Sequence, residues 1–308
     1  MVLEECSNIY WDVIVLVETW RESVKEEFLL DGGHTWYGSG GCKGRCGVGF
    51  IVHNRHDGQH LFAAVSERLA TLWLTLAGLK VKLFGVYMPD STYCDAEVET
   101  VYNQLDFHLR DCTCKRHRHC IVAGDFNARV GSQDFYDDIS ILGSGGLPDR
   151  NSRGDWFLQW CTINQLVIGN THFESDAEHI WTYRNGDRRK QLDYMLFDKQ
   201  LFKNLEDCGV QPELDTGSDH RAVQASLSYT TNKQNRKKRR CQKKVQSIPN
   251  STNEILTANL QDMTATMGLL RSRSCGFRKQ CWKPHKLRKQ MCQRLGQLKT
   301  HIVKQYVI

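Results

Sequence analysis

Two short segments of the chain carry residue types that can hydrolyse phosphate esters. An apolar run over residues 121–123 ends in Gly-Asp-Phe-Asn, which brings Asp125 and Asn127 to the end of a predicted strand. Asp219 and His220 lie side by side later in the chain. A carboxylate can hold a divalent cation, a carboxamide can orient water, and an imidazole can offset charge that develops on a phosphoryl group. These residue types predict metal-assisted cleavage of a phosphodiester.

Three further polar residues are expected at the ends of predicted strands: Glu18, Tyr87 and Asp193. Each has a structural alternative. Glu18 could be an ordinary acid at a helix N-terminus, and Tyr87 could simply pack at its strand end. Asp193 could be an ion-pair partner of Arg188 or Arg189. The Gly-Asp-Phe-Asn segment alone could likewise be a turn after a buried strand. The catalytic interpretation is favoured because all of these strand ends can deliver side chains to one rim.

The apolar pattern predicts an α/β fold that positions these residues. Residues 95–110 carry apolar side chains at three- and four-residue steps, which is typical of an amphipathic helix, and a second helix is expected over about 154–161. Asn185-Gly186 is a favourable hairpin turn between two predicted strands. The predicted strands cover residues 12–17, 48–52, 72–76, 81–87, 121–123, 166–168, 181–183, 192–196 and 222–227.

The charge is divided sharply along the 308 residues. Residues 1–229 carry 22 basic and 33 acidic residues, a net charge of −11. Residues 230–308 carry 19 basic and 2 acidic residues, a net charge of +17. This basic tail (residues 230–308) is expected to be disordered or helical in part, with a weak helix over 255–270, and to contact a polyanion. Its run over residues 235–244 also resembles a nuclear-import patch.

The thirteen cysteines indicate free thiols in a reducing compartment, since the number is odd and the chain opens with no secretory signal. We therefore expect a protein that is not secreted and has no membrane span. One cluster has metal-ligand residue types: Cys112, Cys114, His117, His119 and Cys120. A zinc site there is the less favoured alternative, because basic residues alternate with these side chains and the usual paired spacing is missing.

Six motifs in register carry a resemblance to a known family. They read VLVETWRE, GVGFIVHN, GVYMP, IVAGDFNARVG, WTYRNGDRRKQLDYML and SDHRAV. Over about residues 9–228 the chain resembles the endonuclease/exonuclease/phosphatase superfamily, which has the DNase I-like fold. Within it, the motifs look most like the apurinic-type endonucleases of non-LTR retrotransposons, and proteins similar to craniofacial development protein 2 share this domain type. The resemblance implies a four-layered α/β sandwich of two mixed sheets.

The resemblance also implies a role for each residue at the rim. Glu18, Asp125 and Asp219 would be the carboxylates of a Mg²⁺ or Mn²⁺ site. Tyr87 would touch the scissile phosphate, and Asp125 with Asn127 would orient the attacking water. Asp219 would also orient His220, which would stabilise the transition state, and Asp193 would lie behind the metal or the imidazole.

The chain departs from the family at its opening strand, which normally ends in a metal-site Asn. Only about eleven residues precede Asp12, and they read as the last turns of a helix. We therefore expect residues 1–229 to form the family's domain without its N-terminal strand, which would leave unpaired backbone in a central sheet.

The leading hypothesis is a Mg²⁺-dependent DNA-nicking endonuclease of the retrotransposon type, nuclear or alternatively cytoplasmic, that leaves 3′-hydroxyl and 5′-phosphate ends. One alternative is an inactive fragment that binds nucleic acid. A second is a phosphatase or phosphodiesterase of the same fold that acts on RNA or a phosphoinositide.

Overall fold

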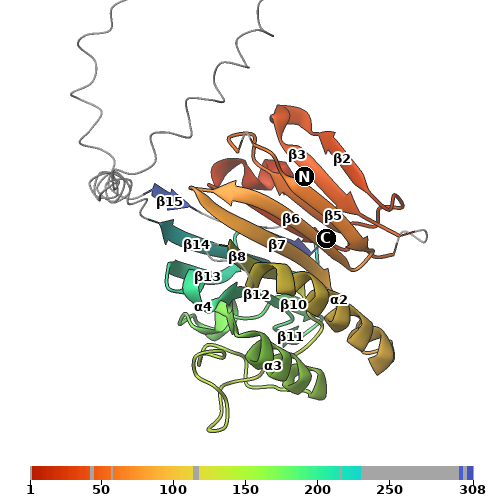
Figure 1. Cartoon of the computed structure of the whole chain (residues 1–308). Helices are drawn as coiled ribbons and strands as arrows, with labels where there is room; N and C mark the ends of the chain where they lie inside the picture. The colour runs from red at the N-terminus through yellow and green to blue at the C-terminus, as the bar shows by residue number, and fades with distance from the viewer. Residues whose placement is uncertain are drawn as a thin grey trace, which may run out of the picture. The chain divides into compact units, whose positions relative to one another are not determined.

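The computed structural model describes residues 2–41, 45–56, 58–113, 118–214, 217–229, 298–300 and 304–307 (Figure 1). The chain divides into two units. The first comprises residues 1–229 together with 297–308, and the second comprises residues 230–296. The helix expected over 255–270 and the basic run over 235–244 lie outside the described residues.

The first unit is built mainly of strands. Its helices are α1 (Val2–Glu5), α2 (Asp95–Thr113), α3 (Ser152–Asn164) and α4 (Lys199–Phe202). Its short 3₁₀ turns are η1 (Cys6–Asn8), η2 (Asp31–Gly33), η3 (Gly169–Thr171) and η4 (Ala177–His179). Its strands are β1 (Val13–Val17), β2 (Glu26–Leu29), β3 (Thr35–Ser39), β4 (Val48–Val52), β5 (Leu61–Ser66), β6 (Leu69–Leu76), β7 (Leu79–Tyr87), β8 (Arg118–Asp125), β9 (Leu166–Ile168), β10 (Tyr183–Asn185), β11 (Arg188–Lys190), β12 (Asp193–Asp198), β13 (Leu205–Gln211), β14 (Ala222–Tyr229), β15 (Leu298–Thr300) and β16 (Lys304–Val307).

Two mixed sheets make up the body of this unit. An eight-stranded sheet has the order β13-β14-β16-β1-β4-β3-β2, with β15 paired to β14, and a six-stranded sheet has the order β5-β6-β7-β8-β12-β9. Strands β7 and β8 are parallel, as are β1 and β16, and the other neighbours are antiparallel. Strands β10 and β11 form a separate hairpin. This is the α/β sandwich that the sequence predicted.

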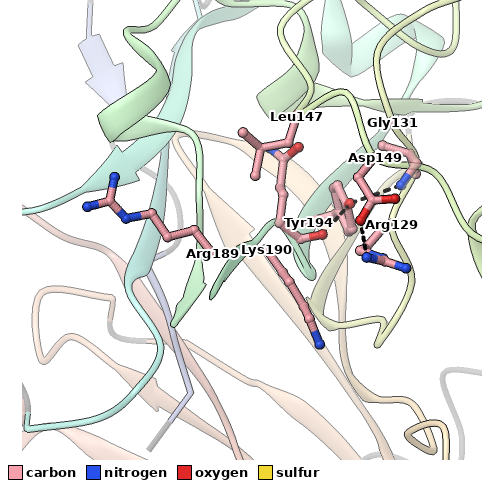
Figure 2. A pocket seen from close by; sticks show the side chains of 9 residues that line it. Arg129, Gly131, Leu147, Asp149, Arg189, Lys190 and Tyr194 are labelled. Carbon is pink, nitrogen blue, oxygen red and sulfur yellow. Dashed lines mark hydrogen bonds and ion pairs between the residues drawn. The ribbon is translucent and has the colours of Figure 1, made fainter. Parts of the chain in front are cut away.

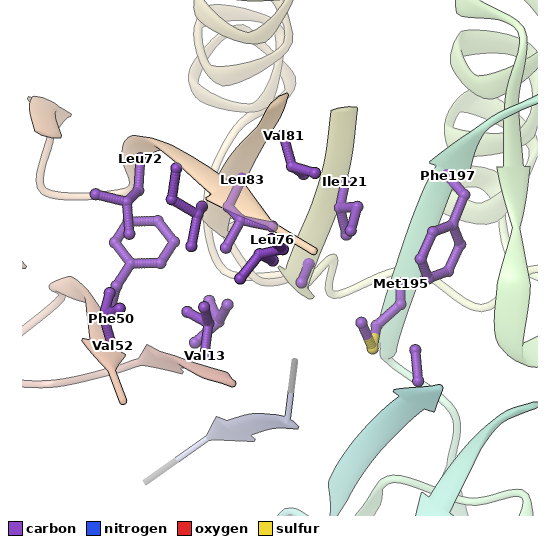
Figure 3. Packing of buried hydrophobic residues seen from close by; sticks show 14 of the residues in the cluster. Val13, Phe50, Val52, Leu72, Leu76, Val81, Leu83, Ile121, Met195 and Phe197 are labelled. Atoms are coloured by element: carbon purple, nitrogen blue, oxygen red, sulfur yellow. The ribbon is translucent and has the colours of Figure 1, made fainter. Parts of the chain in front are cut away.

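Strand β1 shows why the apolar run over residues 13–17 is needed, because this strand packs on both of its faces. Because successive side chains of a strand point to opposite faces, Val13, Val15 and Val17 enter the core between the sheets. Figure 3 shows Val13 in this core. Ile14 and Leu16 face the other side and pack with residues of η1 and α1. A strand buried on both faces needs an unbroken apolar run, and all five residues are buried.

Helices α2 and α3 cover the outer face of the six-stranded sheet. The apolar stripe of α2 and the buried face of α3 join one hydrophobic cluster with residues of β7, β8 and β12. Trp160 of α3 also donates from its indole nitrogen to Asp106 of α2 at 2.8 Å, which ties the two helices together. Burial of this stripe is what holds an amphipathic helix against a sheet.

The Asn185-Gly186 turn joins different strands from those expected. It connects β10 to β11, with Asn185 opposite Arg188, whereas the predicted strand over 192–196 became β12, which pairs with β8 and β9. Gly186 has a φ of 58°, the left-handed conformation that a tight hairpin turn requires. The predicted hairpin turn at Asn185-Gly186 is therefore confirmed. The strand after the turn is β11, however, and not the predicted strand over residues 192–196.

The vacancy expected in the central sheet is occupied. Strand β16 lies between β1 and β14 and pairs with both, and β15 pairs with β14. The expectation that residues 297–308 belong to a separate tail therefore differs from the structure, which groups them with the first unit. The physical reason is that β1 and β14 would otherwise each expose a row of unpaired backbone groups. In the part of the chain that the structure describes, no helix is long and apolar enough to cross a membrane.

Candidate active site

Strand register brings the predicted residues to one rim of the sandwich. In the six-stranded sheet Tyr87 lies opposite Asp125 across the parallel β7–β8 pair. Asp193 lies opposite Asp125 across the antiparallel β8–β12 pair. In the other sheet Glu18 directly follows β1, and His220 lies two residues before β14 begins. The two sheets therefore contribute to the same rim.

Two of these residues have a left-handed backbone. Asn127 has a φ of 48° and Glu18 a φ of 55°. Asn tolerates this conformation because its short polar side chain can bond locally, but for Glu it is strained. The amides of Thr19 and Trp20 donate to the carbonyls of Gly47 and Cys46, at 3.2 and 2.8 Å, which holds the chain in place after Glu18. Strain of this kind accumulates where a site needs a side chain in one direction.

Hydrogen bonds fix Asp125 and Asn127 as one unit. The Asn127 amide donates to Asp125 Oδ1 at 2.8 Å, and its Nδ2 donates to Asp125 Oδ2 at 3.2 Å. The same Nδ2 donates to the carbonyl of Met88 at 2.9 Å. The carboxamide is thus locked to the end of β7 as well as to β8. Asp125 is 2% exposed, so its carboxylate relies on these bonds in place of water.

Asp193 and His220 form a buried acid–imidazole pair. His220 Nδ1 lies 2.9 Å from Asp193 Oδ2. Burial acts to lower the pKa of His220, but the carboxylates of Asp193, Asp125 and Asp219 outweigh it and raise that pKa to about 9. The imidazole is therefore a cation at neutral pH. Its Nδ1–H bonds to Asp193, which leaves the Nε2–H to meet an anionic oxygen.

Asp125, Asp193 and His220 place ligand atoms within 4.8 Å of one another, the one such group among the described residues. Two members of this group already pair with each other, since His220 Nδ1 lies at hydrogen-bond distance from Asp193 Oδ2. Burial and the neighbouring charge of Asp193 raise the pKa of Asp125. The charge of Glu18 also helps to raise the pKa of Asp125, so carboxylates outnumber cations at this rim, which fits a divalent ion.

Tyr87 joins Glu18 to a residue that the sequence did not single out. Burial raises the pKa of the Tyr87 phenol, and the carboxylate of Glu18, to which its hydroxyl donates, raises it further. Tyr87 therefore stays protonated and can donate. The guanidinium of Arg68 lies 5.1 Å from the Tyr87 ring and 4.7 Å from the Tyr93 ring. Arg68 precedes β6 in a turn, without a motif to mark it.

Two buried polar residues position Asp193 and were also missed. Thr182 Oγ1 accepts from the amides of Leu192 and Asp193, at 2.9 and 3.1 Å. Asn170 Nδ2 donates to the Asp193 carbonyl at 3.1 Å. Asn170 lies in η3 and Thr182 just before β10, so no local pattern in the sequence marks either of them.

Asp219 differs from the other predicted residues because its side chain is exposed. Its carbonyl accepts from the amide of Arg184 at 2.9 Å, and its charge helps to raise the pKa of His220. Asp219 thus lies beside the imidazole at the open side of the rim.

The cysteine–histidine cluster lies elsewhere and makes different contacts. His119 Nδ1 lies 3.2 Å from Asp198 Oδ2, and the thiols of Cys112 and Cys120 contact each other in the interior. Cys114 and His117 lie outside the described residues. No group with metal-ligand geometry occurs here within the described part of the chain.

Cationic side chains surround the β10–β11 hairpin beside His220. Arg184, Arg188 and Arg189 are exposed, and Tyr183 of the hairpin forms a bridge with His220. The guanidinium of Arg221 lies 3.4 Å from the centroid of the Trp181 ring. A hollow next to His220 has two of these arginines in its wall. Its lining includes Trp181, Arg184, Asp219 and Arg221.

A second, smaller hollow lies beside β11 (Figure 2). Arg129 and Asp149 form an ion pair at its wall, and the Tyr194 hydroxyl donates to the Gln191 carbonyl at 2.7 Å. Its lining contains none of the predicted site residues, so the chemistry is not centred there.

Comparison with known proteins gives one family and two groups of relatives. A model of the endonuclease/exonuclease/phosphatase family matches residues 1–220. Craniofacial development protein 2 of Bos taurus is 26% identical over 267 residues, which cover 86% of this chain and 42% of that protein. The chain thus spans about two fifths of the length of the curated relatives it matches.

Two solved structures share the fold at low identity. The endonuclease domain of TRAS1, a telomere-specific non-LTR retrotransposon, superposes with a TM-score of 0.51 and 14% identity, covering 72% of this chain and 88% of that one. The 3′ phosphatase NExo from Neisseria, bound to a product DNA hairpin, has a TM-score of 0.53 and 18% identity, covering 74% and 93%. Both likenesses confirm the architecture described above.

Proposed function

The chain belongs to the endonuclease/exonuclease/phosphatase family, and from that premise we propose that it is a divalent-metal-dependent phosphodiesterase that nicks DNA. One observation carries the proposal. A cationic imidazole, held by Asp193 at 2.9 Å, lies beside Asp125, whose pKa is raised. This pairing sets a base next to an acid in a buried site, which is what in-line attack on a phosphodiester needs.

Asp125 and Asn127 act on the attacking water. Asp125 and Asn127 orient a water molecule, and the Asp125 carboxylate takes its proton as the water oxygen bonds to phosphorus. The bond from phosphorus to the 3′-oxygen breaks, and that oxygen takes a proton from solvent. The products are a 3′-hydroxyl and a 5′-phosphate.

Charge on the phosphoryl oxygens must be offset while these bonds change. The Nε2–H of His220 donates to one oxygen, and the Tyr87 hydroxyl donates to another. Asp193 keeps His220 protonated and oriented, because it accepts from the other ring nitrogen. Glu18, Asp125 and Asp219 would hold a Mg²⁺ or Mn²⁺ ion, which would supply Lewis-acid stabilisation when bound.

DNA is the substrate we favour because cations border the site. Arg184, Arg188 and Arg189 are exposed on the hairpin next to His220, where they can neutralise phosphates on either side of the scissile bond. NExo, which shares the fold, was solved with a product DNA hairpin. The endonuclease domain of the retrotransposon TRAS1 is a second nuclease that shares the fold.

The basic tail extends the proposal to affinity and location. Its 19 basic and 2 acidic residues would supply most of the nonspecific attraction to DNA, with a steep dependence on salt. The run over residues 235–244 would direct the protein to the nucleus.

A plasmid assay tests the reaction and its products together. Full-length protein with Mg²⁺ should convert supercoiled plasmid to the nicked circle, and DNA ligase should reseal the nicks, since sealing needs a 3′-hydroxyl next to a 5′-phosphate. His220→Ala should be inactive, whereas His119→Ala, which changes a histidine paired with Asp198 away from the rim, should remain active. Nicks that ligase cannot seal would refute the proposed bond cleavage. Equal activity of the two variants would refute the proposed site.

A further inference from the structure

Arg68 extends the row of rim residues by one strand. The amide of Tyr87 donates to the carbonyl of Arg68 at 2.9 Å, so the two residues lie opposite each other where β6 begins and β7 ends. Tyr87 in turn lies opposite Asp125, and Asp125 opposite Asp193. Neighbouring strands are about 4.8 Å apart, so the backbone of Arg68 lies roughly 10 Å from that of Asp125. Arg68 is therefore at the end of the row that is farther from His220.

The guanidinium of Arg68 has aromatic rings beside it and no acid. Its central carbon lies 5.1 Å from the centroid of the Tyr87 ring and 4.7 Å from that of the Tyr93 ring. Within the part of the chain that the structure describes, no carboxylate lies at ion-pair distance from Arg68, whereas other arginines of the first unit do pair with acids, namely Arg21, Arg55, Arg129, Arg150, Arg153 and Arg189. Because residues 1–229 carry a net charge of −11, an arginine that stays without an acid is a cation available to another anion.

The side chain of Arg68 is held in place but keeps donors to spare. A guanidinium has five N–H donors, and Nη1 of Arg68 contacts the carbonyl of Tyr87 at 3.5 Å, which is the outer limit of a hydrogen bond. Contact with two rings restricts the rotamers of this half-buried side chain, so less entropy is lost when it binds a ligand. A planar, preorganised guanidinium suits the paired oxygens of a phosphate.

Given the nuclease function proposed above, we propose that Arg68 binds a backbone phosphate of the substrate next to the scissile one. Arg68 lies one strand beyond Tyr87, which donates to the scissile phosphate, so the anion that it meets is the next one along the nucleic-acid strand. Arg184 and Arg188 are exposed on the hairpin that contacts His220, at the other end of the row. The site thus holds the substrate on both sides of the bond that breaks. Its substrate is a phosphodiester within a chain, and not a terminal phosphate monoester.

Binding of the full-length protein to a short DNA duplex in EDTA tests this contact without cleavage. Arg68→Ala should raise the Kd by about 10–100-fold at low salt, because a charge-assisted hydrogen bond to a phosphate is lost. The slope of log affinity against log salt should become smaller by about 1, the change expected for one phosphate contact. Arg68→Lys keeps the charge and should keep the slope. An unchanged slope in Arg68→Ala would overturn the proposal.

Arg118→Ala is the matched control for this measurement. Arg118 also lies over an aromatic ring, at 5.0 Å from the centroid of Trp73. It begins β8, however, and so lies at the opposite end of that strand from Asp125. Its removal should leave the slope unchanged. Equal decreases in the two alanine variants would mean that Arg68 adds only general charge, and would contradict a contact at the rim.

Nicking kinetics separate a flanking phosphate from the scissile one. A contact with a flanking phosphate is equally strong before and during the reaction, so Arg68→Ala should raise KM by about 10-fold and change kcat by about twofold or less. A decrease of kcat by about 100-fold at unchanged KM would mean that Arg68 acts on the scissile phosphate, and would overturn the proposal. Arg68→Gln keeps most of the side chain that packs between the rings but has no charge, and it gives the same comparison if Arg68→Ala does not fold.

DNA substrates with one neutral methylphosphonate each identify the phosphate that Arg68 binds. At one position beside the cleaved bond, the substitution should lower kcat/KM of the parent by about 10-fold and leave that of Arg68→Ala unchanged, since this variant has already lost the contact. Equal losses in parent and variant at every position would refute the contact. If the parent shows the difference in salt slope but nicks no DNA, the proposed reaction fails and the Arg68 contact stands. Nicking without that difference would have the opposite meaning.

Discussion

Strand β12 carries an aspartate–histidine pair at each end, and the two pairs make the most informative comparison in the molecule. At its start Asp193 pairs with His220, and at its end Asp198 pairs with His119. The distances are similar, 2.9 and 3.2 Å. Their surroundings differ. The first pair has side chains 1% and 6% exposed, whereas the second has side chains 24% and 12% exposed.

The partners of the two carboxylates explain what each pair does. Asp198 caps α4, since its Oδ1 accepts from the amides of Gln200 and Leu201 at 3.0 and 2.8 Å. Its Oδ2 also accepts from the amide of Cys120 at 3.0 Å. These bonds join α4 and β8 to β12, so the second pair serves the fold. The first pair lies beside a further buried carboxylate, and residue types alone could not have separated the two.

The largest effect is expected at the start of β12, where Asp193 pairs with His220, and it follows from removal of metal. Chelation by excess EDTA should reduce plasmid nicking to background, because the carboxylates of Glu18, Asp125 and Asp219 then lack the cation that offsets them during the reaction. Added Mg²⁺ or Mn²⁺ should restore activity. Calorimetry with and without EDTA would show whether the fold persists, and undiminished nicking in chelator would refute the metal requirement.

The histidines provide the next largest contrast. His220→Ala should lower the nicking rate by roughly 10²–10⁴-fold, the usual range for an acid–base group. His119→Ala should change the rate by about twofold or less, since His119 is far from the reacting atoms in the sheet register, at the opposite end of β8 from Asp125. Single-turnover rates at saturating protein would separate this effect from binding. A large loss of nicking rate in His119→Ala would mean that both aspartate–histidine pairs serve the reaction, and would contradict the proposed difference between them.

The sequence predicted which residues lie at this rim because the ends of buried strands are marked locally. Apolar runs that stop at Asp125 and Asn127, or at Glu18, identify buried strands and their ends without any tertiary information. Polar strands such as β2 and β13 were missed, since their pairing depends on neighbours rather than on an alternating pattern. Strand β16 could not be placed because its partners β1 and β14 lie far away in sequence. Thr182 and Asn170 act through the backbone of β12, which only a folded sheet brings within reach.

A smaller effect, on stability rather than on rate, is expected at the end of β12, where Asp198 pairs with His119. Asp198→Ala should lower the free energy of unfolding by roughly 2–3 kcal/mol, because it removes the cap of α4 and leaves the Cys120 amide without its acceptor. The nicking rate of the folded variant should be close to that of the parent. Urea unfolding measures the change, and Asp187→Ala, in the exposed hairpin turn, is the control expected to be nearly neutral.

The smallest effect is a dependence of stability on pH that arises from the carboxyl group of Asp198. Burial by itself would raise the pKa of this carboxyl, but hydrogen bonds from His119 and from the amides of Leu201 and Cys120 outweigh it and lower the pKa. A carboxyl whose pKa is lower in the folded than in the unfolded state contributes stability that is fully present above its unfolded value of about 3.9. That contribution is lost as the pH falls through the lower, folded value.

The variant Asp198→Asn keeps an oxygen that can cap α4 but has no charge to lose. Its melting temperature should therefore lie below that of the parent by a constant amount between about pH 5 and 7, above the titration of the carboxyl. The difference should shrink as the pH falls below about 4. Asp187→Asn should give no such convergence, because Asp187 is exposed in the hairpin turn. A difference that stays constant down to about pH 2 would mean that the charge of Asp198 adds nothing, and that only the shape of its hydrogen bonds holds this end of β12.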